Sequence, residues 1–168
     1  MSIYRTINPA TGVTEKSFET HSDAEMFAKL DKAHTLWKDD WRLRSFAERR
    51  AIVQKAAETL RRDKEKHARL ISTEMGKVLP EALWEIAVSA DILSYYAAQA
   101  ENFLAPRTLA MVAGQAVVIS QALVGIYCVD PGTFPSYPPA RLAVLMLMPR
   151  NVVTIKYAPA LPRCPSAS

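Results

Sequence analysis

Two cysteines and three histidines are the side chains in this sequence best suited to nucleophilic or metal chemistry. Cys128 falls within an apolar run, and Cys164 lies in the Pro-rich end PRCPSAS. Neither cysteine has a partner at a spacing typical of metal sites, so we expect unpaired thiols, one of them buried, and no bound metal. His21, His34 and His67 belong to no recognised metal or catalytic motif, and we expect them on the surface or packed beside helices.

The loop VDPGTFPSYPP, residues 129–139, is the other stretch that could do chemistry. It follows the apolar run VGIYCV and places Thr133 between two prolines, with Gly132 before it and Phe134 after it. Two prolines around this stretch are an unusual way to leave a strand, and the loop is either an ordinary turn or an active-site loop that has lost its working residue. No glycine-rich dinucleotide motif, P-loop or HExxH motif accompanies it, so the loop by itself leaves both interpretations open.

Composition favours a globular chain that forms one domain or the first part of a larger protein. Of its 168 residues, 49% are hydrophobic and 23% charged, which is enough to bury a core. The net charge of +4 is mild and the run 61–66 alternates in sign, so we expect a solvated helix face and no nucleic-acid partner. The start MSIYRTINPATG has no apolar leader, and we expect a cytoplasmic protein without membrane association.

The first hundred residues predict a hairpin followed by three amphipathic helices. The turn sequence NPATG separates two short strand-like runs. Capping boxes that begin at Ser22 and Ser45 predict a helix over 23–38 and a long helix that ends at Gly76. The third helix begins near Pro80 and ends before Pro106. We expect these helices to bury their apolar faces mainly against one another.

Aromatic side chains in these helices are expected to pack in the core and not to stack on bases. They are Trp37, Trp41, Trp84, Tyr95 and Tyr96.

The remainder of the chain changes to β-branched and small residues, which are typical of strands. The expected elements are strands over 109–112 and 116–120, a strand over 124–129, a helix over 137–148 and a strand over 151–156. The last three form one βαβ unit, and such units normally belong to parallel sheets with more strands. The predicted fold class is therefore α/β: an N-terminal β-hairpin and three amphipathic helices, followed by the first βαβ unit of an incomplete Rossmann-like sheet.

The helix expected over 137–148 needs a surface to cover its apolar side chains, and further strands would normally provide it. These side chains are Leu142, Val144, Leu145 and Met148. We therefore expect residues 1–104 to form a protected helical unit. Residues beyond 120 are expected to be loosely ordered or covered by a second chain that pairs with the strand edges.

Six motifs occur in a characteristic order along nearly the whole chain. They are INPATG at 7–12, EMGK at 74–77, the YYA stretch that ends at Ala97, AENFL at 100–104, VGIYCVDPGTFP at 124–135 and NVVTIKYAP at 151–159. In order and spacing they resemble the amino-terminal part of the aldehyde dehydrogenase superfamily, most closely the NAD(P)-dependent succinate-semialdehyde dehydrogenases. The resemblance implies oxidation of an aldehyde, such as succinate semialdehyde, to the acid.

The resemblance also assigns roles to individual residues. In the family the loop usually reads PWNFP, and its Asn donates a hydrogen bond to the oxyanion formed when a cysteine thiolate attacks the aldehyde. Here Gly132 and Thr133 replace the Trp and Asn, and losing such a donor typically costs about 2.7 to 4 kcal/mol of transition-state stabilisation. Lys156 matches the lysine that reaches the coenzyme's adenosine ribose or 2′-phosphate, although a solvated lysine would also end a strand in this way. Arg150 stands where the family favours a glycine that can take positive φ.

By the same resemblance the chain divides into residues 1–107 (hairpin and helices), 108–123 (a β-extension used in subunit contacts), 124–160 (the βαβ unit of a partial coenzyme-binding domain) and 161–168 (a tail). The family's coenzyme-binding glycines, general-base Glu and nucleophilic Cys have no counterpart in these residues. We therefore expect no complete catalytic site and no NAD(P) bound by this chain alone.

Three functions remain open on the sequence. The chain is a truncated or degenerate family member that is inactive alone, or an assembly module that pairs with itself or with full-length subunits through strand edges. The third is an autonomous small enzyme or nucleic-acid binder that uses the basic helix face.

Overall fold

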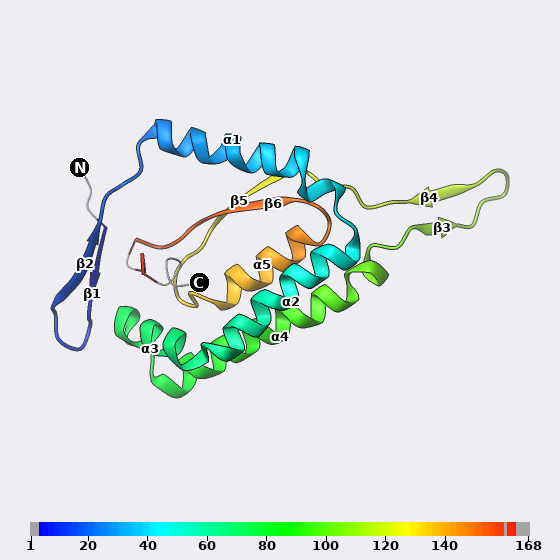
Figure 1. The fold of residues 1–168 in the computed structure, drawn as a ribbon. Helices are drawn as coiled ribbons and strands as arrows, with labels where there is room; N and C mark the ends of the chain where they lie inside the picture. The colour runs from blue at the N-terminus through cyan, green and yellow to red at the C-terminus, as the bar shows by residue number, and fades with distance from the viewer. Residues whose placement is uncertain (1–3, 160, 164–168) are drawn as a thin grey trace.

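A hairpin, a group of helices and a two-stranded parallel sheet follow one another along the chain (Figure 1). The computed structural model describes residues 4–159 and 161–163. The elements are β1 (Tyr4–Ile7), β2 (Thr14–Phe18), α1 (Asp23–Asp39), the 3-10 helix η1 (Trp41–Leu43), α2 (Phe46–Arg62), α3 (Lys64–Met75), α4 (Leu79–Phe103), β3 (Arg107–Leu109), β4 (Ala116–Val118), β5 (Gly125–Val129), α5 (Tyr137–Leu147) and β6 (Val152–Lys156). This order confirms the predicted α/β class.

The hairpin turn and the helix caps form as the sequence predicts. β1 and β2 pair antiparallel around the NPATG turn, in which Gly12 has a φ of 71°. Both capping boxes are complete: the N-cap Ser22 accepts from the backbone of Glu25, whose carboxylate accepts from the N–H of Ser22 at 2.7 Å, and Ser45 forms the same box. Such reciprocal bonds satisfy N–H groups that a helix start leaves free.

The prediction of a single long helix that ends at Gly76 is wrong, because the helix breaks at Asp63 into α2 and α3. Asp63 leaves helical geometry, with ψ at 20°, and its carboxylate pairs with Arg62 instead of capping α3. The break lets α3 bury Ile71 against Ile86 of α4. Packing between helices thus overrides the continuous periodicity.

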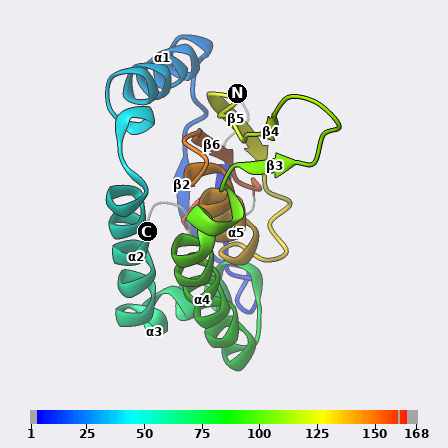
Figure 2. The same cartoon turned by 90° about the vertical axis from the view of Figure 1, so that its right-hand side faces the viewer.

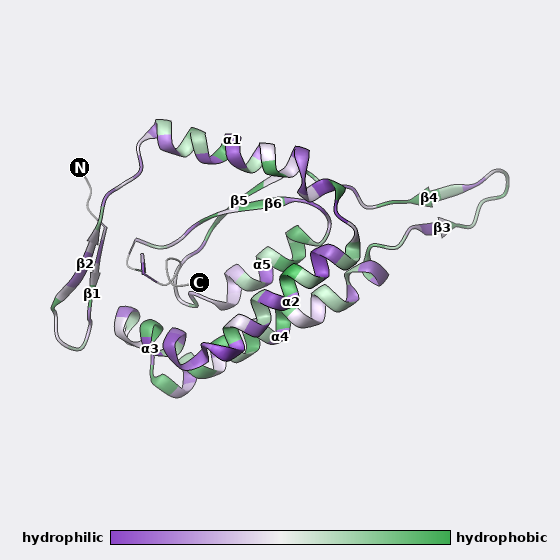
Figure 3. Ribbon diagram, viewed as in Figure 1, coloured by the Kyte–Doolittle hydropathy of each residue, from purple (hydrophilic) through white to green (hydrophobic). Residues whose placement is uncertain are grey.

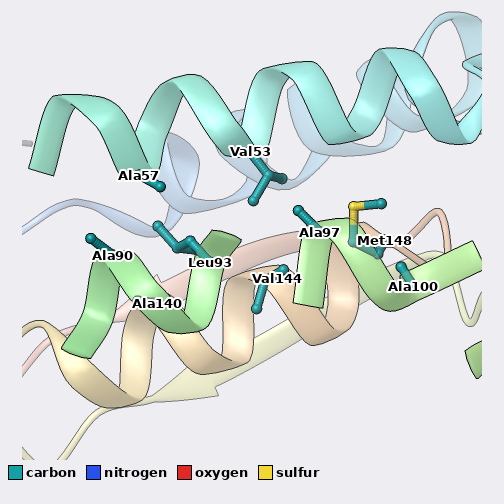
Figure 4. Packing of buried hydrophobic residues seen from close by; sticks show 9 residues of the cluster. All are labelled: Val53, Ala57, Ala90, Leu93, Ala97, Ala100, Ala140, Val144 and Met148. Carbon is teal, nitrogen blue, oxygen red and sulfur yellow. The ribbon is translucent and has the colours of Figure 1, made fainter. Parts of the chain in front are cut away.

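One core joins α2, α4 and α5, as Figure 4 shows. Its buried members are Val53, Ala57, Ala90, Leu93, Ala97, Ala100, Ala140, Val144 and Met148. Alanines allow the helices to approach closely, and burying a side chain such as Val or Met stabilises the fold by about 1.5–3 kcal/mol. The expectation that residues beyond 120 are loosely ordered or covered by a second chain is wrong for α5, because Val144 and Met148 are buried against α2 and α4 of the same chain.

The carboxyl end of α5 is also held by polar side chains from the first half of the chain. Arg49, fully buried, donates from Nε to the carbonyl of Met148 at 3.1 Å. The indole N–H of Trp41 donates to the carbonyl of Leu147 at 3.1 Å, and that of Trp37 to the carbonyl of Arg150 at 2.8 Å. A cation at this end complements the helix dipole and satisfies carbonyls that have no partner within the helix.

Helix α1 lies across the β5–β6 sheet, on the side opposite to α5 (Figures 1 and 2). It has no buried residue, so the prediction that all three helices pack mainly on one another is wrong for α1. Of the aromatic side chains expected in the core, Trp41 is buried, whereas Trp84 and Tyr95 are 57% and 56% exposed. The prediction of core packing is therefore wrong for Trp84 and Tyr95.

Strands β5 and β6 pair in parallel from Gly125↔Val152 to Val129↔Lys156, as expected for a βαβ unit. β3 and β4 pair antiparallel and form a hairpin that projects from the rest of the chain (Figures 1 and 2). The strand expected over 109–112 is displaced to Arg107–Leu109, because Leu109 pairs with Ala116 and the intervening residues form the loop. Figure 3 shows hydrophobic residues on this projecting hairpin as well as on the helices.

No helix in the described part of the chain combines the length and the apolar character that crossing a membrane requires.

Candidate functional site

The loop over 130–136 leaves the carboxyl end of β5, next to the end of β6. The backbone N–H of Asp130 donates to the carbonyl of Lys156 at 2.9 Å, which joins the two strand ends. In open α/β sheets, ligands bind in the crevice at this edge. The structure therefore places Thr133 and Lys156, the two candidate site residues, on segments that leave the same edge of the sheet.

Gly132 gives this loop a backbone that other residues rarely adopt. Its φ is 90°, and an added Cβ would lie 2.5 Å from Cβ of Ala158 and 3.0 Å from Cδ1 of Leu161. Both the positive φ and the close approach require glycine. The tryptophan usual at this position in the family does not fit the loop as this chain folds it.

Thr133 follows directly and is exposed. Its carbonyl accepts a hydrogen bond from Nζ of Lys77 at 3.2 Å. The accessible donor at this point is thus a hydroxyl on a short side chain, where the family carries an amide. A hydroxyl can donate one hydrogen bond to a developing oxyanion if it is brought within about 3 Å.

Behind the loop lies an ion pair that the sequence analysis missed. Nζ of Lys77 is 2.5 Å from Oε2 of Glu85, and the two side chains are 8% and 0% exposed. Lys77 also lies 3.9 Å from the ring centroid of Phe134, in cation–π geometry. Lys77 belongs to the EMGK motif, but no motif or spacing indicated that this lysine and Glu85 meet beneath the loop.

Asp130, at the start of the loop, is buried and neither of its carboxylate oxygens has a well-formed hydrogen bond. Burial raises the pKa of Asp130 above its ordinary value, the backbone N–H of Gly132 opposes this shift, and the charge of Glu85 adds to it. An unpaired buried carboxylate is costly to ionise. Asp130 is therefore an acidic group that the fold tolerates best with its proton bound.

Lys156 ends β6 with an exposed side chain. Its Nζ donates to the neighbouring carbonyl of Tyr157 at 3.3 Å, a contact that leaves the ammonium able to meet an anion. A cleft of about 570 Å³ adjoins it, lined also by His21 and Lys29. Lys29 and Lys156 offer positive charge suited to a phosphate group, and Glu19 in the same lining opposes it.

The remaining candidate groups do not gather at this edge. Cys128 lies within β5 as a half-buried free thiol, and Cys164 lies outside the described residues. His67 is buried in α3, where burial lowers its pKa, which confirms the packing interpretation. Nowhere in residues 4–159 and 161–163 do three or more His, Cys, Asp or Glu side chains form a group that could hold a metal ion.

The turn from α5 into β6 has the strain that the sequence indicated. Arg150 has a φ of 74°, in the left-handed region that favours glycine. Val124, just before β5, also has a positive φ of 86°, and Asn151 accepts from its N–H and from that of Leu123. The departure at Arg150 is thus accommodated, with strain, in an otherwise intact turn.

The fold and this loop define the class of protein. The chain belongs to the aldehyde dehydrogenase family, whose sequence model matches residues 2–166. It is 36% identical over 160 residues to the succinate-semialdehyde dehydrogenase (NADP(+)) of Deinococcus radiodurans, a match that covers 95% of this chain and 33% of that protein. It is 38% identical over 159 residues to the probable succinate-semialdehyde dehydrogenase (NADP(+)) of Synechocystis, covering 95% of this chain and 35% of the relative.

Solved structures of similar sequence have the same fold as this chain. Succinic semialdehyde dehydrogenase from Streptococcus pyogenes, in complex with NADP+, is 34% identical with a TM-score of 0.93, covering 98% of this chain and 36% of that one. Gox0499, studied for its cofactor and substrate selection, is 53% identical with a TM-score of 0.97, covering 99% of this chain and 37% of that one. The chain therefore spans about a third of the length of the relatives it matches, at their amino-terminal end.

Proposed function

We infer that this chain is a degenerate form of the amino-terminal part of an NADP-linked aldehyde dehydrogenase related to the succinate-semialdehyde dehydrogenases, and that alone it does not oxidise aldehydes. The observation that carries this proposal is the loop at the sheet edge, which has Thr133 in place of the usual amide donor and no thiol beside it among the described residues. Cys128 lies within β5, half-buried, and not on the loop.

The residues present fit the phosphate of a coenzyme better than a whole dinucleotide. Lys156 would hold a phosphate or ribose oxygen with its exposed ammonium, next to a cleft that Lys29 and Glu19 also line. When bound, NADP+ accepts a hydride from the substrate. An exposed lysine in water contributes little binding free energy by itself, so affinity of this chain for NADP+ is expected to be weaker than millimolar.

The direct test is turnover by the purified chain with NADP+ and succinate semialdehyde, followed by the absorbance of NADPH. We expect no turnover above a protein-free control. Turnover that rises with protein concentration and disappears in Cys128→Ser or Cys164→Ser would overturn the proposal. Calorimetric titration with NADP+ tests the coenzyme part, and a micromolar affinity abolished by Lys156→Ala would contradict it.

A second candidate is an assembly module, favoured by the projecting β3–β4 hairpin. Val117, Val118 and Ile119 on this hairpin are 52%, 45% and 58% exposed, and an exposed apolar hairpin can add strands from another chain. Sedimentation of the chain alone and mixed with a full-length relative would distinguish this function. A chain that stays monomeric and does not co-sediment would rule it out.

A further inference from the structure

The first turn of α5 has few backbone donors to satisfy. A helix start normally leaves four N–H groups without partners. In the sequence Ser136-Tyr-Pro-Pro139, the two prolines have no N–H, so only Ser136 and Tyr137 carry a donor before the helical bond from Ala140 N to the carbonyl of Ser136. The side chain of the N-cap Ser136 makes no capping bond. The start of α5 therefore needs an acceptor from elsewhere for two donors.

Glu85 supplies that acceptor from α4. Its Oε1 accepts from the N–H of Ser136 at 2.7 Å and from the N–H of Tyr137 at 3.1 Å. The side chain is fully buried, and a negative charge at a helix start is favoured by the helix dipole. One carboxylate oxygen thus meets both donors.

Lys77 connects the same carboxylate to the other side of the loop. It pairs with Oε2 of Glu85 at 2.5 Å, donates to the carbonyl of Thr133 at 3.2 Å and lies over the ring of Phe134. A buried carboxylate needs such a partner, because an unpaired charge in the interior is costly. The loop is therefore fixed at residues 133 and 134 by the ammonium and at residues 136 and 137 by the carboxylate.

We propose that Glu85 and Lys77 are positioning residues that together set the conformation of the loop over 133–137, and hence where the side chain of Thr133 lies at the sheet edge. This deepens the proposed function, since the loop is the segment that holds the aldehyde oxygen in the family. The positioning itself is a property of the folded chain and does not require turnover. Its test can therefore fail or succeed independently of any activity.

Hydrogen exchange of single amides, read by NMR on the full chain, tests the pair. In Glu85→Ala the amides of Ser136 and Tyr137 should exchange roughly tenfold to a hundredfold faster than in the unchanged chain, because each loses a bond to a charged acceptor. Glu85→Gln keeps an acceptor oxygen but loses the ion pair, so it should restore part of this protection. Lys77→Met should instead change the backbone NMR chemical shifts mainly at Thr133 and Phe134, because the ammonium contacts the carbonyl of the first and the ring of the second.

The matched control is Glu74→Gln, which alters another buried glutamate, one that accepts from Thr6 and from the N–H of Arg163. It should leave the amides over 133–137 at their original exchange rates relative to the rest of α5. Equal acceleration throughout α4 and α5 in all variants, or unchanged loop amides in Glu85→Ala, would overturn the proposal. If Glu85→Ala does not fold, the contrast between Glu85→Gln and Lys77→Met still decides it.

Discussion

Helix α5 and the β3–β4 hairpin both come from apolar sequence in the second half of the chain, yet one is buried and the other is exposed. Val144 and Met148 of the α5 region are 0% and 2% exposed, whereas Val117 and Ile119 are 52% and 58% exposed. Glu85 contacts the start of α5 and Arg49 contacts its end. Hydrophobicity alone therefore does not predict which apolar segment of this chain is buried, and the buried α5 differs from the exposed hairpin in having polar partners at both of its ends.

The largest expected effect comes from removing an apolar side chain at the end of α5. Met148→Ala should lower the free energy of unfolding by about 3 kcal/mol, through lost burial and the cavity left behind. Val118→Ala in the hairpin should change it by less than about 0.5 kcal/mol, because that side chain is already exposed. Urea unfolding of both variants measures the difference. Similar losses in the two would show that the hairpin is as well packed as α5.

A second effect concerns the loop that leads into α5. Asp130→Asn should raise the free energy of unfolding at neutral pH by about 1 to 3 kcal/mol, since it removes the ionisation of a buried carboxylate whose oxygens have no well-formed hydrogen bond. Urea unfolding of the two proteins over a range of pH provides the measurement.

The pH dependence follows from the raised pKa of the folded carboxyl. The unfolded chain loses this proton at the ordinary pKa of Asp, and the folded chain loses it only at higher pH because burial raises the pKa of Asp130. Stability of the unchanged chain therefore falls as pH rises through this window, and the advantage of Asp130→Asn is largest above the folded pKa. An advantage that grows toward acidic pH would contradict the assignment.

The smallest expected effect lies at the turn that follows α5. Arg150→Gly should stabilise the chain by about 0.5 to 1 kcal/mol, because glycine adopts the observed positive φ without strain. Arg141→Gly, at an exposed position within α5, should destabilise it by about 1 kcal/mol through lost helix propensity. Thermal unfolding that shifts both variants in the same direction would argue against strain at Arg150.

Contacts between neighbouring residues were predictable from the sequence, and contacts between distant ones were not. The capping boxes at Ser22 and Ser45, the end of α3 at Gly76 and the strain at Arg150 depend on backbone geometry within a few residues. The break at Asp63 depends on how α3 meets α4, and periodicity carries no information about that encounter.

In the candidate site, too, some positions were predictable from the sequence and one contact between distant residues was not. The places of Thr133 and Lys156 at the ends of β5 and β6 followed from motif order and parallel pairing. Glu85 is 51 residues from Ser136 in the chain, so no local spacing indicated their contact. The two prolines in the first turn of α5 were a usable signal. Because they have no N–H, only the N–H groups of Ser136 and Tyr137 need an acceptor from elsewhere in the chain.

Two tryptophans outside α5 contact its carboxyl end, and their fluorescence can report on the packing of this helix. The indole N–H groups of Trp37 and Trp41 are both hydrogen-bonded to carbonyls at this end, whereas Trp84 is 57% exposed on α4. A dissolved quencher should therefore reach Trp84 readily and Trp41 poorly. Undocking of α5 would break both indole hydrogen bonds and bring the buried Trp41 into water, so fluorescence of the unlabelled chain reports this movement.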